Sequence, residues 1–142
     1  MSERIKHPDI FNALKTNVLP VLYATIWIGI SEFVRNEFLL ASYWNEHYEN
    51  LGLVFPSTPI NGAIWGLWSL CFAIAIFIIA KKFTLLQTVL LSWFVVFVFM
   101  WLVIGNMGVL PFGILTFAIP LSLFETFFAS LIIKKCRIKS DN

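Results

Sequence analysis

The longest uncharged stretch of this chain, Phe83 to Phe124, limits its possible folds more than any other feature. As a single α-helix, at about 1.5 Å per residue, it would be about 60 Å long, twice the roughly 30 Å hydrocarbon core of a bilayer. The segment 105–108, Gly-Asn-Met-Gly, followed by Pro111, breaks helical geometry and supplies a proline for the start of a new helix. The stretch is therefore expected to cross a membrane twice.

The composition of the whole chain is that of a membrane protein. Only 13% of the 142 residues are charged and 59% are hydrophobic, whereas soluble domains are about 25% charged. We therefore expect an all-α integral membrane protein, a four-helix bundle built from a single membrane domain over residues 1–142. Four spans, each long enough for a bilayer, are predicted at 18–42, 60–80, 84–104 and 112–133. A short amphipathic helix at about 8–16 is expected to lie at the inner interface.

The basic residues lie almost entirely outside the predicted spans. Nine of the ten Lys and Arg residues precede the first span, separate the second from the third, or follow the fourth: Arg4, Lys6, Lys15, Lys81, Lys82, Lys134, Lys135, Arg137 and Lys139. Basic clusters favour the cytoplasmic face, and only an even number of crossings returns all of them to one face. We therefore expect both termini in the cytoplasm of a multi-pass protein, which we interpret as a protein of the bacterial cytoplasmic membrane.

The second span contains small residues at helical spacing. They form a seam on one face: Gly62, Gly66, Ser69 and Ala73. The first span repeats this spacing with partly polar residues: Thr25, Gly29, Glu32 and Asn36. Because close packing in lipid depends on small residues and interhelical hydrogen bonds, the first two spans are expected to pack together. The alternative is that the glycine seam forms a homodimer.

Aromatic residues gather near the expected outer boundary of the membrane. They include Tyr43, Trp44, Tyr48, Trp65, Trp68 and Trp101. We interpret them as interfacial anchors rather than as a ligand-binding cage. In the same region, Thr58 followed by Pro59 predicts the start of the second span, with a hydroxyl cap before a proline in the first turn.

Glu32 and Arg35 are charged residues within the first span. A charged side chain in a spanning helix costs about 2.5–3.5 kcal/mol on insertion scales, so it usually faces the protein interior or water. Arg35 and Asn36 follow Glu32 by three and four residues and are within its reach on one helix face. The structural interpretation is a neutralised pair that orients the span. The functional interpretation is a polar vestibule in which Arg35 attracts an anion or a lipid headgroup.

Glu125 in the fourth span has no basic neighbour in its own span before Lys134. Depth along the helix axes separates it from Glu32 by about 9 Å, so the two carboxylates are not expected to share a proton or an ion directly. We expect Glu125 to be the uncharged acid at neutral pH, because desolvation disfavours its charged form. Hydroxyl groups expected at its level could form a polar nest around it: Ser122, Thr126, Thr25 and Ser92. Such a group is either structural or part of a proton or cation relay.

The leading functional hypothesis is a small multi-pass protein that moves or senses a proton, an ion or a small solute through a polar interior. An alternative is an accessory or assembly subunit of a larger membrane complex. The expected partners are the lipid bilayer and either further copies of the chain or a larger membrane protein, with no nucleic acid. A third hypothesis, an enzyme acting on lipid, needs a nucleophile or metal ligands, and the sequence offers no catalytic constellation, cofactor motif or metal-binding cluster. His47, between Glu46 and Glu49, is only a weak metal candidate.

Overall fold

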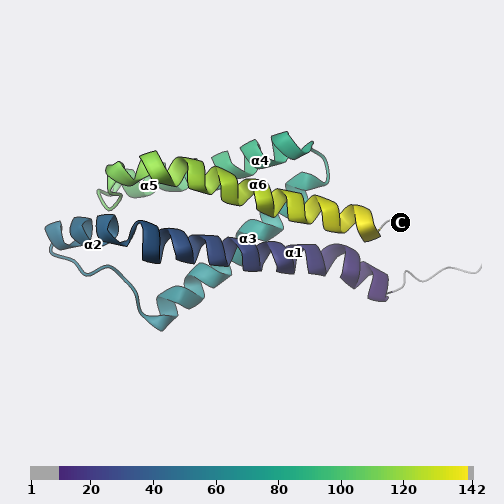
Figure 1. Cartoon of the computed structure of the whole chain (residues 1–142), viewed down its shortest axis with the longest axis horizontal. Coiled ribbons are helices and arrows are strands. Elements are labelled where there is room, and N and C mark those ends of the chain that lie inside the picture. The colour runs from purple at the N-terminus through teal and green to yellow at the C-terminus, as the bar shows by residue number, and fades with distance from the viewer. Residues whose placement is uncertain (1–9, 141–142) are drawn as a thin grey trace, which may run out of the picture.

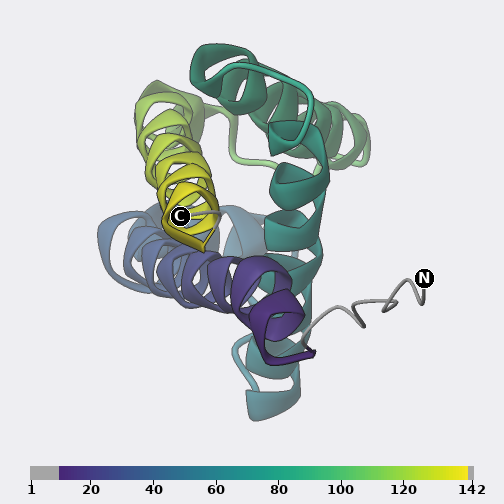
Figure 2. The ribbon, with the colours of Figure 1, turned by 90° about the vertical axis from the view of Figure 1, so that its right-hand side faces the viewer.

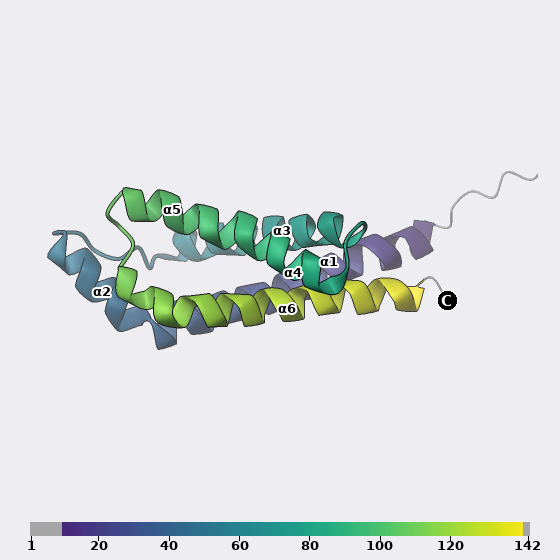
Figure 3. The same ribbon diagram turned by 90° about the horizontal axis from the view of Figure 1, so that it is seen from above.

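A computed structural model describes residues 10–140, with side chains for 14–137, and these residues form helices and no strands. The first half of the chain contains α1 (Ile10–Phe33), a π-helical segment η1 (Val34–Leu39), α2 (Ala41–Asn50) and α3 (Pro59–Ala80). The second half contains α4 (Leu85–Trp93), a π-helical segment η2 (Phe94–Val98), α5 (Phe99–Asn106), a short 3-10 helix η3 (Phe112–Ile114) and α6 (Leu115–Ser140). Figure 3 shows that α4, η2 and α5 follow one another as a continuous helix.

Four stretches of helix are long and apolar enough to cross a membrane. They are Leu14–Leu39, Pro59–Ala80, Leu85–Asn106 and Phe112–Arg137. Many of their large apolar side chains point away from the bundle, as illustrated by Ile60, Leu86 and Leu102, which are 68%, 68% and 66% exposed. An apolar exterior of this kind is compatible with a multi-pass membrane protein.

The predicted interfacial helix at 8–16 is not a separate element. Residues 10–16 are the opening turns of α1, while residues 8 and 9 lie outside the described residues. No glycine or proline interrupts the chain between residue 10 and residue 19, so nothing there ends the helix. Pro20 is accommodated inside α1.

The four long helical stretches form a closed bundle. Viewed from one end, α1 lies beside α3, α3 beside α4, α4 beside α6, and α6 beside α1 (Figure 2). Alanines are fully buried where the helices meet, at Ala24, Ala73 and Ala129. Their small side chains allow the backbones to approach closely. Phe72 and Phe97 fill the space between them and meet edge to face, with ring centroids 5.6 Å apart.

Both ends of the described chain and the α3–α4 connection lie at the same end of the bundle (Figure 1). We call this the basic end, because it carries Lys81, Lys82, Lys134, Lys135 and Arg137. Its elements are tied together by Lys134 on α6, whose Nζ donates hydrogen bonds to the carbonyl oxygens of Phe83, at 2.6 Å, and Ala80, at 3.4 Å. The opposite end, which we call the α2 end, contains α2 and the connections at 51–58 and 107–111.

The small-residue seam packs along half of its length. A Cβ atom at Gly29 of α1 would lie 3.8 Å from Ser69 Oγ, so α1 and α3 meet closely there. At Gly62 and Gly66, by contrast, a Cβ atom would meet no other atom within 4 Å. The first two spans pack together as predicted, but Gly62 and Gly66 take no part in that contact. The physical reason is the crossing angle: α3 diverges from α1 toward the α2 end (Figure 1), which limits close contact to the crossing point.

Candidate functional site

Arg35 connects two buried carboxylates that come from different helices. Its Nη1 donates to Glu125 Oε2 at 3.0 Å, and its Nη2 donates to Glu32 Oε1. The three side chains are buried, with 5% of Arg35, 5% of Glu32 and 1% of Glu125 exposed. Each contact is both an ion pair and a hydrogen bond, the strongest type of polar contact between protein side chains. We call these three residues the charge cluster.

The charge cluster lies where α1 changes its helical geometry. Leu40 N donates to the carbonyl oxygen of Arg35 at 2.9 Å, the five-residue spacing of a π-helix. π-helical turns are rare in proteins and are frequent at functional sites. Arg35 lies in this segment, and its guanidinium also stands over the ring of Phe97 in η2, 5.1 Å from the centroid. A second π-helical segment therefore contributes a cation–π contact to the same arginine.

The separation of about 9 Å along the helix axes did not predict that a single guanidinium contacts both Glu32 and Glu125. Positions along the helix axes do not include the direction in which each side chain leans. Helical side chains lean toward the N-terminus of their own helix, and α1 and α6 are antiparallel. Glu32 and Glu125 consequently lean toward one another, and the long side chain of Arg35 spans the remaining distance.

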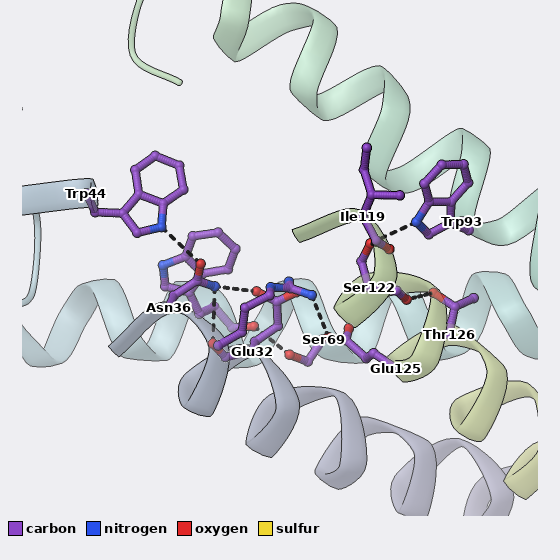
Figure 4. Close-up of polar contacts among 11 residues, drawn as sticks. Glu32, Asn36, Trp44, Ser69, Trp93, Ile119, Ser122, Glu125 and Thr126 are labelled. Atoms are coloured by element: carbon purple, nitrogen blue, oxygen red, sulfur yellow. Dashed lines mark hydrogen bonds and ion pairs between the residues drawn. The ribbon is translucent and has the colours of Figure 1, made fainter. Parts of the chain in front are cut away.

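Asn36 and Trp44 extend the charge cluster toward the α2 end. Asn36 Nδ2 donates to Glu32 Oε2 at 2.8 Å, and Trp44 Nε1 donates to Asn36 Oδ1 at 3.1 Å. The result is a continuous chain of polar contacts from α2 to α6, much of which is visible in Figure 4. Both oxygens of Glu32 are thereby engaged.

Glu125 is held less completely than Glu32. Its Oε2 is paired with Arg35, while its Oε1 is buried and makes no hydrogen bond with any described residue. The backbone at this position is fixed, because Trp27 Nε1 on α1 donates to the carbonyl oxygen of Glu125 at 3.0 Å. The site therefore contains one buried carboxylate oxygen that is free to accept a proton or a cation.

The predicted hydroxyl nest around Glu125 does not form. Thr25, Ser122 and Thr126 donate instead to carbonyl oxygens three or four residues earlier in their own helices, at 2.8, 3.0 and 2.8 Å. Ser122 also accepts a hydrogen bond from Trp93 Nε1 at 2.8 Å (Figure 4). Ser92 Oγ is buried and makes no hydrogen bond among the described residues. In apolar surroundings a helical hydroxyl bonds to the preceding turn of its own backbone, and this satisfies most of these groups.

A large cavity of about 580 Å³ lies beside the charge cluster, toward the α2 end. Its polar lining includes Glu32, Arg35, Asn36, Glu37 and Asn61, and its aromatic lining includes Trp44, Tyr48, Phe55, Trp65 and Trp101. Gly62 and Gly66 form part of its wall. Several aromatic residues interpreted from the sequence as membrane anchors therefore line a cavity. The sequence shows this group of aromatic residues. It does not show that they line one cavity, because they come from different helices.

A smaller cavity of about 270 Å³ is also lined by Arg35. It is bordered by α1 and α6 and is lined by apolar residues such as Trp27, Leu39 and Phe124. Glu125 lines the small cavity, Glu32 lines the large one, and Arg35 lines both. Arg35 thus borders two cavities, and each of them is also lined by one of its carboxylate partners.

Several contacts hold the α2 end together, and some of them are between residues that line the large cavity. Phe55 stacks on Trp44, with centroids 5.6 Å apart, and meets Tyr48 edge to face at 5.3 Å. His47 Nε2 lies 2.9 Å from the carbonyl oxygen of Gly108, to which it can donate a hydrogen bond. His47 therefore joins α2 to the 107–111 connection. Within the described residues, no three His, Cys, Asp or Glu side chains are grouped so that they could hold a metal ion.

Comparison of the chain with protein-family models, with curated proteins and with solved structures gives no match. The charge cluster and its two cavities are therefore the features of the molecule from which a function can be inferred.

Proposed function

We propose that this chain is an integral membrane protein with four spans and both termini in the cytoplasm, in a bacterial cytoplasmic membrane. The grouping of basic residues supports this orientation. Lys81 and Arg137 both stand over the ring of Phe77, at 4.6 and 5.5 Å from its centroid, so basic side chains from the α3–α4 connection and from the last turns of α6 meet at one end. Residues 36–80 and 83–133 contain no Lys or Arg, which leaves the α2 end without basic residues.

The function we propose is the reversible binding of one proton or small cation at the charge cluster, by which the protein moves or senses that ion. The observation that carries this proposal is that Glu32 and Glu125 share Arg35 while buried. With both acids ionised, the cluster has one uncompensated negative charge. Because such a charge is costly away from water, the cluster is driven to take up one positive charge.

Glu125 is the residue to which we assign the proton. It has a buried oxygen without a partner, whereas both oxygens of Glu32 accept hydrogen bonds. A protonated Glu125 would be a weaker partner for Arg35, because protonation removes the coulombic attraction of their ion pair. Arg35 would then remain with Glu32, and the link between α1 and α6 would loosen. Proton binding is in this way coupled to the arrangement of two spans.

The test is ion flux into liposomes that contain the purified protein and an internal pH-sensitive dye. We expect an imposed pH gradient to dissipate faster than in protein-free liposomes, and Glu125→Ala to abolish this flux. Glu49→Gln removes an exposed acid of α2 and is the matched control. The proposal is wrong if the wild-type protein moves neither protons nor monovalent cations faster than empty liposomes and, in addition, its infrared spectrum shows no carboxyl band of Glu125 that changes with pH.

A second candidate function is that of an accessory or assembly subunit in a larger membrane complex. It is favoured by Gly62 and Gly66, where the backbone of α3 is open to the approach of another helix. In that case the protein should co-purify with a partner from mild detergent and show no flux alone, and Gly66→Leu should abolish co-purification. Neither role involves covalent chemistry, so we propose that the protein is not an enzyme.

A further inference from the structure

We propose that the large cavity binds a monovalent organic cation with an apolar or aromatic body, with its positive group directed at Glu32 and Glu37. This inference rests on the proposed function and deepens it, because it names the chemical class of the solute. It concerns the large cavity, whereas the proton is assigned to Glu125 in the small one.

The charge of the cavity lining favours a cation. Glu32 and Glu37 both line the cavity, and Arg35 is its basic residue. Arg35 is also paired with Glu125, which lies outside this lining, so its positive charge is shared with a third carboxylate. The balance at the cavity surface is therefore negative, which repels anions.

The surroundings of the cavity would also attract cations. Residues 36–80 comprise the end of η1, α2, the 51–58 connection and α3, and they contain three Glu and no Lys or Arg. Two of these, Glu46 and Glu49, are exposed on α2. A region lined by charge of one sign raises the local concentration of the opposite ion and steers it toward the site.

The aromatic lining indicates an organic rather than an inorganic cation. Trp44, Trp65 and Trp101 come from three different elements and line the same cavity. The faces of aromatic rings attract cations, and cages of such rings recognise quaternary ammonium groups. A small metal cation needs several oxygen ligands and would leave this wall unused. The volume of about 580 Å³ falls within the range of about 300–1,000 Å³ that is typical of small-molecule pockets.

The cavity can be reached from outside the bundle. Trp65 is 41% exposed although it lines the cavity, and Glu37 is exposed at its rim. On the α3 side, Gly62 and Gly66 have no side chains that could block the cavity, and no atom lies within 4 Å of a Cβ placed on either residue. These features explain why the glycines of the α3 seam lie where no helix packs. An entering cation would first meet Glu37 and the tryptophans, and then Glu32 (Figure 4 shows Trp44, Asn36 and Glu32).

The experiment measures binding of tetraphenylphosphonium to the full-length protein in nanodiscs of zwitterionic lipid, with tryptophan fluorescence as the signal. Tetraphenylborate, which has the same shape and the opposite charge, is the control ligand, and empty nanodiscs correct for partition into lipid. We expect saturable binding of tetraphenylphosphonium and none of tetraphenylborate. Glu32→Gln and Trp65→Leu should each weaken binding about tenfold, as expected for the loss of one charge or one cation–π contact.

Two matched variants keep the result specific. Lys135→Gln removes an exposed charge at the basic end that does not line the cavity, and Phe38→Leu removes an exposed aromatic ring that does not line it either. Both should bind like the wild type. Equal binding of the two probes, or saturable binding unaffected by both Glu32→Gln and Trp65→Leu, would overturn the inference.

The outcome also separates this inference from the proposed function. If tetraphenylphosphonium does not bind while Glu125-dependent proton flux persists, the assigned solute class is wrong and the charge-binding function stands. If it binds as expected while no flux of any ion is seen and the carboxyl signal of Glu125 does not respond to pH, the binding site stands and the proposed function fails.

Discussion

Arg35 and Glu125 are joined by a 3.0 Å ion pair although 90 positions separate them along the chain. The same guanidinium is paired with Glu32, three residues before it. Two acids and one base therefore occupy a buried site between α1 and α6. This ratio, rather than the presence of charge alone, determines how the site should respond to substitution.

The first prediction concerns Glu32→Gln and Glu125→Gln, singly and combined. Either single variant leaves Arg35 with one carboxylate and a balanced charge, so each should cost about 1 kcal/mol or less. The double variant leaves a buried guanidinium without a counter-ion and should cost about 3–5 kcal/mol. Unfolding in mild detergent, followed by circular dichroism, measures the difference. Strictly additive effects would contradict the shared-guanidinium arrangement.

The second prediction concerns removal of the base. Arg35→Met leaves two buried acids without a counter-ion and should destabilise the protein by about 3–5 kcal/mol. Adding Glu32→Gln and Glu125→Gln to this variant removes both negative charges and should recover most of the lost stability. Arg35→Lys should remain less stable than the wild type, because an ammonium group lacks the planar fork that serves two carboxylates. If the neutral triple variant is no more stable than Arg35→Met, charge compensation is not what holds the cluster.

The third prediction is spectroscopic. In infrared difference spectra, a protonated carboxyl band should grow as the external pH falls between about pH 9 and 5, and it should be absent in Glu125→Gln. Glu49→Gln should retain the band, because that residue is exposed on α2. A spectrum that does not change over this range would assign Glu125 a purely structural role.

The fourth prediction concerns orientation in the membrane. After Cys71 and Cys136 are replaced by alanine, single cysteines are placed at Ser57, at Asn106 and at Lys82. A membrane-impermeant maleimide added to intact cells should label positions 57 and 106 at the α2 end, and should reach position 82 at the basic end only after lysis. Labelling of position 82 from outside would reverse the proposed orientation.

The fifth prediction tests the basic end of the bundle. Lys134→Met removes the hydrogen bonds to the carbonyl oxygens of Ala80 and Phe83 and should destabilise the protein by about 1–2 kcal/mol. Lys135→Met removes the neighbouring exposed charge and should have little effect, which makes it the matched control. Equal effects of the two variants on the unfolding midpoint would argue against a specific tie between α6 and the α3–α4 connection.

Local signals in the sequence were sufficient for several features. The predicted start of the second span is confirmed: Thr58 precedes α3, Pro59 lies in its first turn, and Thr58 N donates to Asn61 Oδ1 at 3.1 Å. The grouping of Glu32, Arg35 and Asn36 is also confirmed, since contacts between residues three and four apart follow from helical geometry alone. Features of this kind depend on a few neighbouring residues and not on the rest of the fold.

The sequence by itself determined that four stretches are long apolar helices, because a chain with so few charges satisfies its backbone within helices and turns apolar side chains outward. Only the tertiary structure decided that Arg35 reaches Glu125 and that tryptophans from separate elements line one cavity. Those outcomes depend on which helices are neighbours, on their crossing angles and on the directions in which side chains lean. No single span encodes these relationships, since each arises between two spans.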